Sequence, residues 1–200
     1  YDVSTAVHAG AGEEFSVGSE ETQPFGLEFN NDGTKMFIVG STDDAVVEYN
    51  LGTGYDVSTA VYAGAGEEFS VAGEETSPAG LVFNNDGTTM FIVGYSDDAV
   101  VKYNLGTAYD VSTAVYAGAG EEFSVAGEET IPLGLAFNND GTKMFIVGYL
   151  DDAVVEYDLG TAYDVSTAVY AGAGEEFSVA GEETDPYGLA FNNNGTKMFI

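Results

Sequence analysis

Three pairs of adjacent aspartates recur along the chain at a spacing of 54 residues, each between two apolar segments. Ca²⁺ prefers several oxygen ligands, and a ring of acidic turns could supply them. These segments do not match the D-x-D-x-D-G calcium loop, and turn formation with solvated charge is the alternative explanation. Ca²⁺ is the one cofactor that the sequence suggests, with the candidate ligands Asp43, Asp44, Asp97, Asp98, Asp151 and Asp152.

Acid–base catalysis needs unique residues, whereas most carboxylates of this chain repeat. A glycosidase, for example, uses two carboxylates at a defined separation, one with a raised pKa. The singular polar residues are His8, Lys102 and Glu28. We interpret His8 as a surface or packing substitute for tyrosine, and Lys102 as a solvated charge swap. No nucleophile triad or phosphate loop is present. The sequence therefore predicts that the protein is not an enzyme.

The charge balance excludes several partners. Asp and Glu total 34, Lys totals 4 and Arg is absent, which gives a formal net charge of -30. Such a surface repels nucleic-acid phosphates and anionic membranes. No apolar run is long enough for membrane insertion, and there is no Cys. The Glu-Glu pairs, such as Glu13-Glu14, Glu20-Glu21 and their repeats, are expected to be solvated. Adaptation to a salty or calcium-containing medium, and so an extracellular or surface-displayed location, competes with simple acidic solubility.

A tandem repeat organises the whole chain. The string YDVSTAV begins at Tyr1, Tyr55, Tyr109 and Tyr163, always 54 residues apart. We expect a single domain over residues 1–200, with repeats 1–54, 55–108, 109–162 and a partial copy at 163–200. Such regularity places each copy in an equivalent position of a symmetric assembly. A longer parent, or self-association of two chains, would close the ring.

Each copy reads as short strands joined by tight turns. Strands are expected at 25–30, 35–40, 45–50 and 67–72, because apolar residues there alternate or form short dense runs. The Asn-Asp-Gly-Thr turn at 31–34 predicts a hairpin in which Gly33 has a positive φ. Asp56 could cap one helical turn, and no longer helix is expected. Four antiparallel strands per copy predict an all-β fold, a β-propeller with three complete blades and a partial one.

One stretch resembles a known repeat family. Residues 132–148 (PLGLAFNNDGTKMFIVG), followed by DDAVVEYDL at 151–159, resemble the YVTN-type propeller repeat and the repetitive propellers of secreted bacterial and phage-associated proteins. Asn stands where the family has Pro before Asp140, and Asn194 replaces the aspartate in the last copy. The resemblance implies that the first strand lines a central channel and the fourth lies at the rim.

The copies differ from one another mainly in three places, which are the flanks of each proline, the turn before each acidic pair and the first strand. In a propeller these places share one face and the mouth of the channel, where ligands bind. Neutral drift in exposed loops is the alternative. The predicted ligand face consists of Phe25, Glu28, Tyr95, Leu133, Tyr149 and Tyr187.

Together these patterns favour a non-catalytic extracellular propeller for binding, adhesion or scaffolding, with a protein or carbohydrate ligand. Two alternatives stay open. One is a propeller enzyme similar to the lactonases or quinoproteins that share this repeat style. The other is an architectural spacer in a fibre or stalk.

Overall fold

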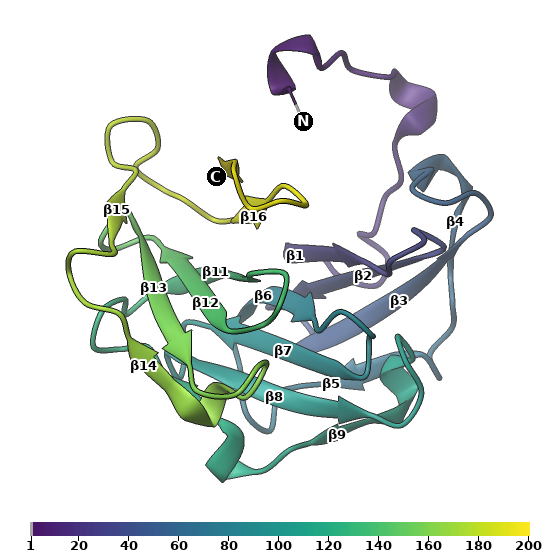
Figure 1. Ribbon diagram of the computed structural model, residues 1–200. Helices are drawn as coiled ribbons and strands as arrows, with labels where there is room; N and C mark the ends of the chain where they lie inside the picture. The colour runs from purple at the N-terminus through teal and green to yellow at the C-terminus, as the bar shows by residue number, and fades with distance from the viewer. Residues whose placement is uncertain (1) are drawn as a thin grey trace.

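The computed structural model describes residues 2–200 and shows an all-β chain of antiparallel sheets (Figure 1). Tyr1, where the first YDVSTAV string begins, lies outside the described residues. The first sheet contains β1 (Pro24–Phe29), β2 (Lys35–Gly40), β3 (Ala45–Leu51), β4 (Ala60–Tyr62) and β5 (Glu68–Ser70). The second contains β6 (Pro78–Phe83), β7 (Thr89–Gly94), β8 (Ala99–Leu105), β9 (Ala114–Tyr116) and β10 (Phe123–Ser124).

The third sheet repeats this plan and the fourth is short. The third contains β11 (Pro132–Phe137), β12 (Lys143–Gly148), β13 (Ala153–Leu159), β14 (Ala168–Tyr170) and β15 (Phe177–Ser178). The fourth pairs β16 (Ala190–Phe191) with β17 (Met198–Phe199). Each complete sheet crosses a boundary of the sequence repeats, because the segment that begins with YDVST closes the sheet before it. The predicted strands are thus confirmed, with ends that shift by one or two residues.

The predicted fourth strand at 67–72 forms as the shorter β5, and β4 is a further strand that was not predicted. In the first sheet β4 pairs with residues 49–51 of β3, and β5 pairs with residues 45–47 of the same strand. Between β3 and β4 lies the short 3-10 turn η3 (Val57–Thr59), whose first backbone N–H groups are capped by Asp56, as expected from the sequence. Helical structure in residues 2–200 is limited to such three-residue turns, namely η1 (Val3–Thr5), η2 (Ala11–Glu13), η3, η4 (Val111–Thr113), η5 (Ala119–Glu121) and η6 (Val165–Thr167).

The predicted hairpin turn forms as expected. Gly33 has a φ of 70°, and Asp32 Oδ1 accepts a hydrogen bond from the Thr34 backbone N–H at 3.0 Å. Side chains of the turns also join neighbouring repeats. Asn31 Nδ2 donates to the Asn85 carbonyl at 2.7 Å, and Asn85 Nδ2 donates to the Asn139 carbonyl at 2.6 Å. Asn139 donates in turn to Asn193, which completes a run of amide bonds that we call the asparagine ladder.

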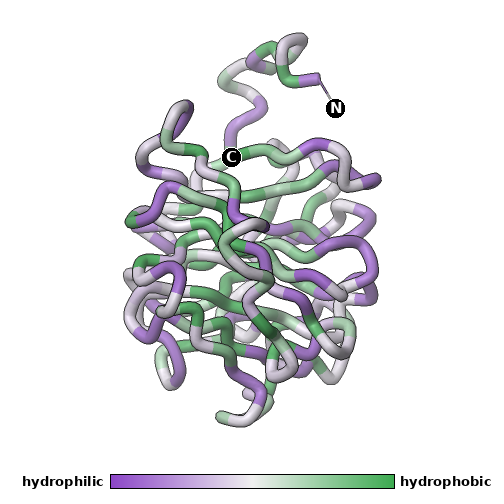
Figure 2. Tube along the Cα trace, turned by 60° about the vertical axis from the view of Figure 1, so that its left-hand side comes forward, coloured by the Kyte–Doolittle hydropathy of each residue, from purple (hydrophilic) through white to green (hydrophobic). Residues whose placement is uncertain are grey.

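The core lies between adjacent sheets, and strands alternate their side chains toward both neighbours. In β7, Met90 and Ile92 pack against the first sheet, whereas Phe91 and Val93 pack against the third. Each fully buried side chain of this size contributes roughly 1.5–3 kcal/mol. The strands are correspondingly hydrophobic and the connecting loops hydrophilic (Figure 2). Each sheet therefore depends on its neighbours for the burial of its faces.

Buried polar contacts accompany this core. Tyr103 is fully buried, and its hydroxyl donates to Glu74 at 3.1 Å. The equivalent bonds join Tyr49 to Glu20 and Tyr157 to Glu128. Burial raises the pKa of Tyr103, and the adjacent Glu74 carboxylate adds to that effect. The expectation that the Glu20-Glu21 pair and its repeats are solvated is therefore wrong for the first three repeats, where the first glutamate accepts a bond from a core tyrosine, whereas Glu182 and Glu183 of the fourth repeat are exposed.

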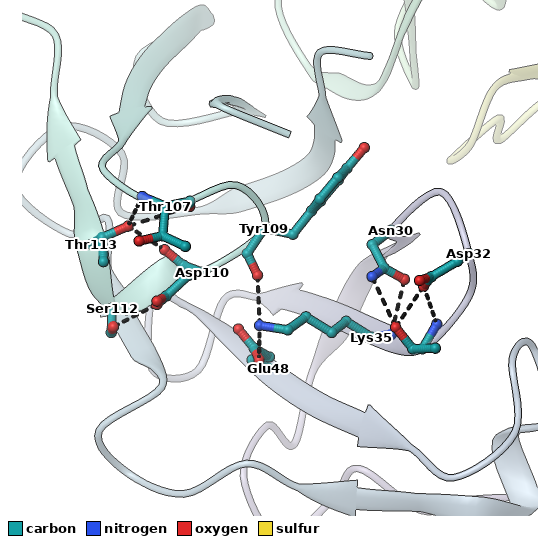
Figure 3. A network of polar contacts seen from close by, with 10 residues as sticks. Asn30, Asp32, Lys35, Glu48, Thr107, Tyr109, Asp110, Ser112 and Thr113 are labelled. Atoms are coloured by element: carbon teal, nitrogen blue, oxygen red, sulfur yellow. Dashed lines mark hydrogen bonds and ion pairs between the residues drawn. The ribbon is translucent and has the colours of Figure 1, made fainter. Parts of the chain in front are cut away.

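One lysine, Lys35, ties the first sheet to the second (Figure 3). Lys35 Nζ lies 2.6 Å from Glu48 Oε1 and donates to the Tyr109 carbonyl of the second sheet at 2.8 Å. Burial raises the pKa of Glu48, and the Lys35 ammonium opposes that shift. The second repeat has Thr89 in place of Lys35, and there Lys102 Nζ lies 2.8 Å from Glu121. The interpretation of Lys102 as solvated is wrong, since its side chain is only 16% exposed.

The first strands of the sheets line a narrow centre, where glycine is required. A Cβ on Gly26 would lie 2.6 Å from the Ala79 carbonyl oxygen, and one on Gly80 would lie 3.0 Å from that of Leu133. Strands β1, β6 and β11 therefore pack backbone to backbone, as the first strands of a propeller-like fold do. The described residues do not close a ring, because Leu27 is 52% exposed while its equivalents Leu81 and Leu135 are buried.

Replacing Gly80 by alanine will destabilise the fold by about 1–3 kcal/mol, because the added methyl group must push two strands apart. Gly127 is the matched control, since a Cβ there meets no atom within 4 Å. Urea denaturation will show a lower midpoint for G80A and an unchanged or slightly higher one for G127A. Equal midpoints would contradict the close packing of the first strands.

Candidate functional site

Five of the six predicted ligand-face residues line one hollow at the end of the channel. This hollow, which we call the aromatic cup, has a volume of about 240 Å³. Its lining comes from all four repeats, from the starts of first strands and from the turns between second and third strands. The lining residues are Phe25, Tyr95, Ile131, Leu133, Tyr149 and Tyr187. Ile131 is the one member that the sequence prediction missed, although it flanks one of the variable prolines.

Two tyrosine rings of the cup, those of Tyr95 and Tyr187, contact the ring of Phe25. Phe25 stacks on Tyr187, with ring centroids 6.2 Å apart and an interplanar angle of 13°. Phe25 also meets Tyr95 edge to face at 6.4 Å. Tyr95, Tyr149 and Tyr187 line the cup and are partly exposed, so a ligand from solvent can reach them. Rigid amphipathic rings in this arrangement suit a small cyclic ligand that stacks against them.

Buried carboxylates position the loops of the cup. Glu75 is fully buried, and its carboxylate accepts backbone N–H bonds from Ser77 at 2.7 Å, Ser96 at 3.2 Å and Asp97 at 3.3 Å. It thereby joins the loop before β6 to the turn that carries Tyr95. Burial raises the pKa of Glu75, while the three N–H donors oppose that shift.

Glu129 makes the same bonds in the third repeat, with Ile131, Leu150 and Asp151 as donors at 2.8, 3.4 and 3.3 Å. We call Glu75 and Glu129 the loop braces. The sequence prediction placed both in solvent, and this was wrong. A Cβ on Gly94 would lie 2.5 Å from the Glu75 carboxyl carbon, so the recurring glycine at the end of the second strand was the available signal.

The cup opens into a channel between the first strands. The channel has a volume of about 130 Å³ and shares Phe25, Leu133 and Tyr187 with the cup. Its wall is formed by repeated Gly and Leu residues and by Glu28, the sixth predicted ligand-face residue. In the other copies this position holds Val82, Ala136 and Ala190. Among the residues that line the cup and the channel in the described chain, Glu28 is the only carboxylate.

Glu28 also borders a polar hollow on the far side of the channel. This hollow, about 550 Å³ in volume, is lined further by Asn30, Asn31, Tyr55 and Asn193. Water can therefore reach the carboxyl group from the side opposite the cup. Burial raises the pKa of Glu28 to about 7. A carboxyl group with this pKa exchanges a proton near neutral pH, as a general acid or base must.

The predicted calcium ligands lie in the β2–β3, β7–β8 and β12–β13 turns. The second aspartate of each pair, Asp44, Asp98 or Asp152, has a positive φ and a buried Oδ1 without a hydrogen-bond partner. The first of each pair, Asp43, Asp97 or Asp151, donates its backbone N–H to a buried glutamate. Over residues 2–200, no three His, Cys, Asp or Glu side chains converge to hold a metal ion. Ca²⁺ binding thus stays a prediction without geometric support.

The remaining singular residue is peripheral. His8 Nε2 lies 3.3 Å from Glu14 Oε1, and the His8 side chain is 73% exposed. This agrees with its interpretation as a surface substitute. No helix within residues 2–200 has the length and hydrophobicity to cross a membrane.

Comparisons with known proteins find likeness in structure alone. No protein-family model and no curated protein matches the chain. Among solved structures, a protein described as a "putative 6-phosphogluconolactonase" from Bacteroides fragilis has a TM-score of 0.60 at 14% identity, over 88% of this chain and 46% of that one. One of the same description from Bacteroides uniformis has a TM-score of 0.59 at 12% identity, over 88% and 46%. Kuenenia stuttgartiensis hydrazine synthase has a TM-score of 0.55 at 17% identity, over 88% and 40%.

These comparisons establish a propeller-like fold, and the chain spans less than half the length of these similar structures. They also correct the expectation that the protein is not an enzyme, because two of the similar structures carry the description of a lactonase. That expectation gave weight to the symmetry of the repeats, because an active site needs unique polar residues. Glu28, already singular in the sequence, lies in the channel. The YVTN-type resemblance stays a prediction, since no family model matches.

Replacing Glu129 by alanine will destabilise the protein by about 2–4 kcal/mol, because three backbone N–H groups lose the acceptor that a buried carboxylate provides. Glu183 is the matched control, since it occupies the same motif in the fourth repeat but is exposed. Urea denaturation will show a large loss for E129A and a small one for E183A. A small loss for both would show that the brace does not hold the loops.

Replacing Glu28 by valine, the residue of the second repeat, will stabilise the protein more at pH 8 than at pH 4. The pKa of Glu28 is raised from 4.5 to about 7 in the folded protein. Between pH 4.5 and pH 7 the folded chain therefore binds more protons than the unfolded chain, and the free energy of unfolding falls as the pH rises. The difference between the two pH values should be about 1–3 kcal/mol. In A136V the stability change should not depend on pH. A change for E28V that is equal at both pH values would contradict the raised pKa.

Proposed function

We propose that this chain is the substrate-binding part of a propeller hydrolase of the lactonase type, which opens a small cyclic ester. The observation that supports it is the aromatic cup opening onto a channel in which Glu28, with a pKa near 7, is the single carboxylate among the described residues. The cup is smaller than the roughly 300–1,000 Å³ of drug-sized sites, which favours a ligand of one ring. The descriptions of two similar structures support the same reaction class.

In this proposal the ester ring stacks between the aromatic side chains of the cup, with its carbonyl toward the channel. Glu28, in its ionised form, accepts a proton from a water molecule as the water oxygen attacks the carbonyl carbon. The bond between the acyl carbon and the ring oxygen then breaks. The leaving alkoxide takes up a proton from protonated Glu28 or from solvent, and the product is a hydroxy acid.

The finer features of the fold belong to this proposal. We propose that each complete sheet is one propeller blade and that the resemblance to YVTN-type repeats reflects common descent. Closure of the ring needs more blades than residues 2–200 provide, either from further repeats or by self-association. An extracellular or surface-displayed location fits the net charge of -30, and Ca²⁺ could serve as a counter-ion to the acidic turns.

The substitution E28Q tests the catalytic role. With glucono-δ-lactone as substrate, and after subtraction of spontaneous hydrolysis, kcat/KM should fall about 100-fold or more in E28Q. In the wild-type protein kcat/KM should rise with pH through about 7, because the ionised carboxylate is the base. E175Q removes an exposed carboxylate and should retain full activity. A pH profile that is unchanged in E28Q would reject Glu28 as the base, and absence of turnover in the wild type would reject the proposed function.

A further inference from the structure

We infer that the aromatic cup selects an uncharged ring and rejects its phosphate ester, although the similar structures are described as acting on a phosphorylated lactone. This inference rests on the proposed function for the site and names the substrate class. It is carried by the positions of the cations and of the loop N–H groups around the cup.

The first observation concerns the cations. The protein has four lysines and no arginine, and none of these lysines lines the cup or the channel. Lys35 and Lys143 are the first residues of β2 and β12, the second strands of their sheets. Lys35 pairs with Glu48, and Lys143 pairs with Glu156. The opposite end of each of these strands is the one near the cup, and six residues span about 20 Å. These ammonium groups are therefore distant from the cup and already paired with carboxylates.

Lys102 and Lys197 offer no cation to the cup either. Lys102, on β8 of the second sheet, pairs with Glu121 at the end of η5. Lys197 occupies the position of Lys35 in the fourth repeat. The ionised groups around a bound ring would then be carboxylates, among them Glu28 in the channel and the two loop braces, and these repel an anion.

The second observation concerns the backbone donors. Loops rich in N–H groups bind phosphate when successive groups converge on it. Around the cup these groups converge on the braces instead, since Glu75 accepts the N–H of Ser96 and Glu129 that of Leu150. Each brace is a resident anion that occupies the donors a phosphate would use. A phosphate group entering the cup would lose its hydration without gaining a cation or a free loop N–H as partner, and the tyrosine hydroxyls alone would remain as donors.

The third observation is the field of the whole molecule. Because its net charge is -30, the protein repels a phosphate dianion at long range and so slows its approach to the cup. An uncharged ring is unaffected by this field. Its hydroxyl groups can bond the hydroxyls of Tyr95, Tyr149 and Tyr187 at the rim, and its faces can stack on the rings.

The test uses a stable ligand pair that needs no turnover, gluconolactam and its 6-phosphate, and measures binding by calorimetry. We expect the lactam to bind at least about 10-fold more tightly than its phosphate at low salt. The gap should narrow at 0.5 M salt, where the screening length falls well below the roughly 10 Å of 0.1 M salt. Y149A should weaken binding of the lactam about 10-fold, because one stacking wall is lost.

A variant that adds a cation beside the cup tests the same inference in the opposite direction. Leu150 lies beside Tyr149 and is 56% exposed, so L150K adds a cation at the rim without disturbing the core. It should tighten binding of the phosphate several-fold and leave the lactam unchanged. Equal or tighter binding of the phosphate by the wild-type protein, or no binding of either ligand, overturns the inference. Binding of the lactam without hydrolysis of any lactone rejects the enzymatic proposal and leaves the inference standing.

Discussion

A sheet of this protein has two apolar faces and cannot bury either of them alone. Met90 and Ile92 need the sheet before, and Phe91 and Val93 need the sheet after. This mutual burial forces the sheets into a fan around a common centre, where only glycine allows the first strands to approach. The cup and the channel are consequences of that approach. The starts of the first strands from all four repeats are brought to one mouth, whatever side chains they carry.

Near-identity of the repeats therefore does not imply an inert surface. The framework residues repeat because each must satisfy the same neighbours, while the mouth and the channel are free to vary. Glu28 occupies a position that is filled elsewhere by Val82 or alanine. A single substitution in a symmetric framework has produced the one carboxylate among the described residues of the channel. The residues that repeat form the framework, and the residues that differ between repeats provide the chemical groups of the cup and the channel.

Much of this arrangement was predictable from local patterns. The turn around Gly33, the cap by Asp56 and the strands of each repeat follow from short-range rules of turn chemistry and apolar periodicity. The meeting of Phe25, Tyr95 and Tyr187 was predictable because the copies differ there and the topology brings those places together. The burial of Glu75 and Glu129 was not, since a carboxylate inside a protein contradicts the usual preference for solvent. Only the three-dimensional convergence of backbone N–H groups makes this burial favourable. The burial of Lys102 was not predictable either, because its partner Glu121 comes from a separate part of the chain.

The bonds of the asparagine ladder all run in one direction, because each side-chain amide N–H donates to a backbone carbonyl of the following repeat. The ladder bond is thus the same at the three junctions that it spans, whereas the bond from Lys35 to the Tyr109 carbonyl has no counterpart where Thr89 replaces the lysine. A sheet that lacks a neighbour on one side has one apolar face uncovered and is expected to unfold first. Insertion or deletion of one 54-residue unit would change how many faces are covered, and so the heat tolerance of the protein, while the contacts inside each sheet stay the same.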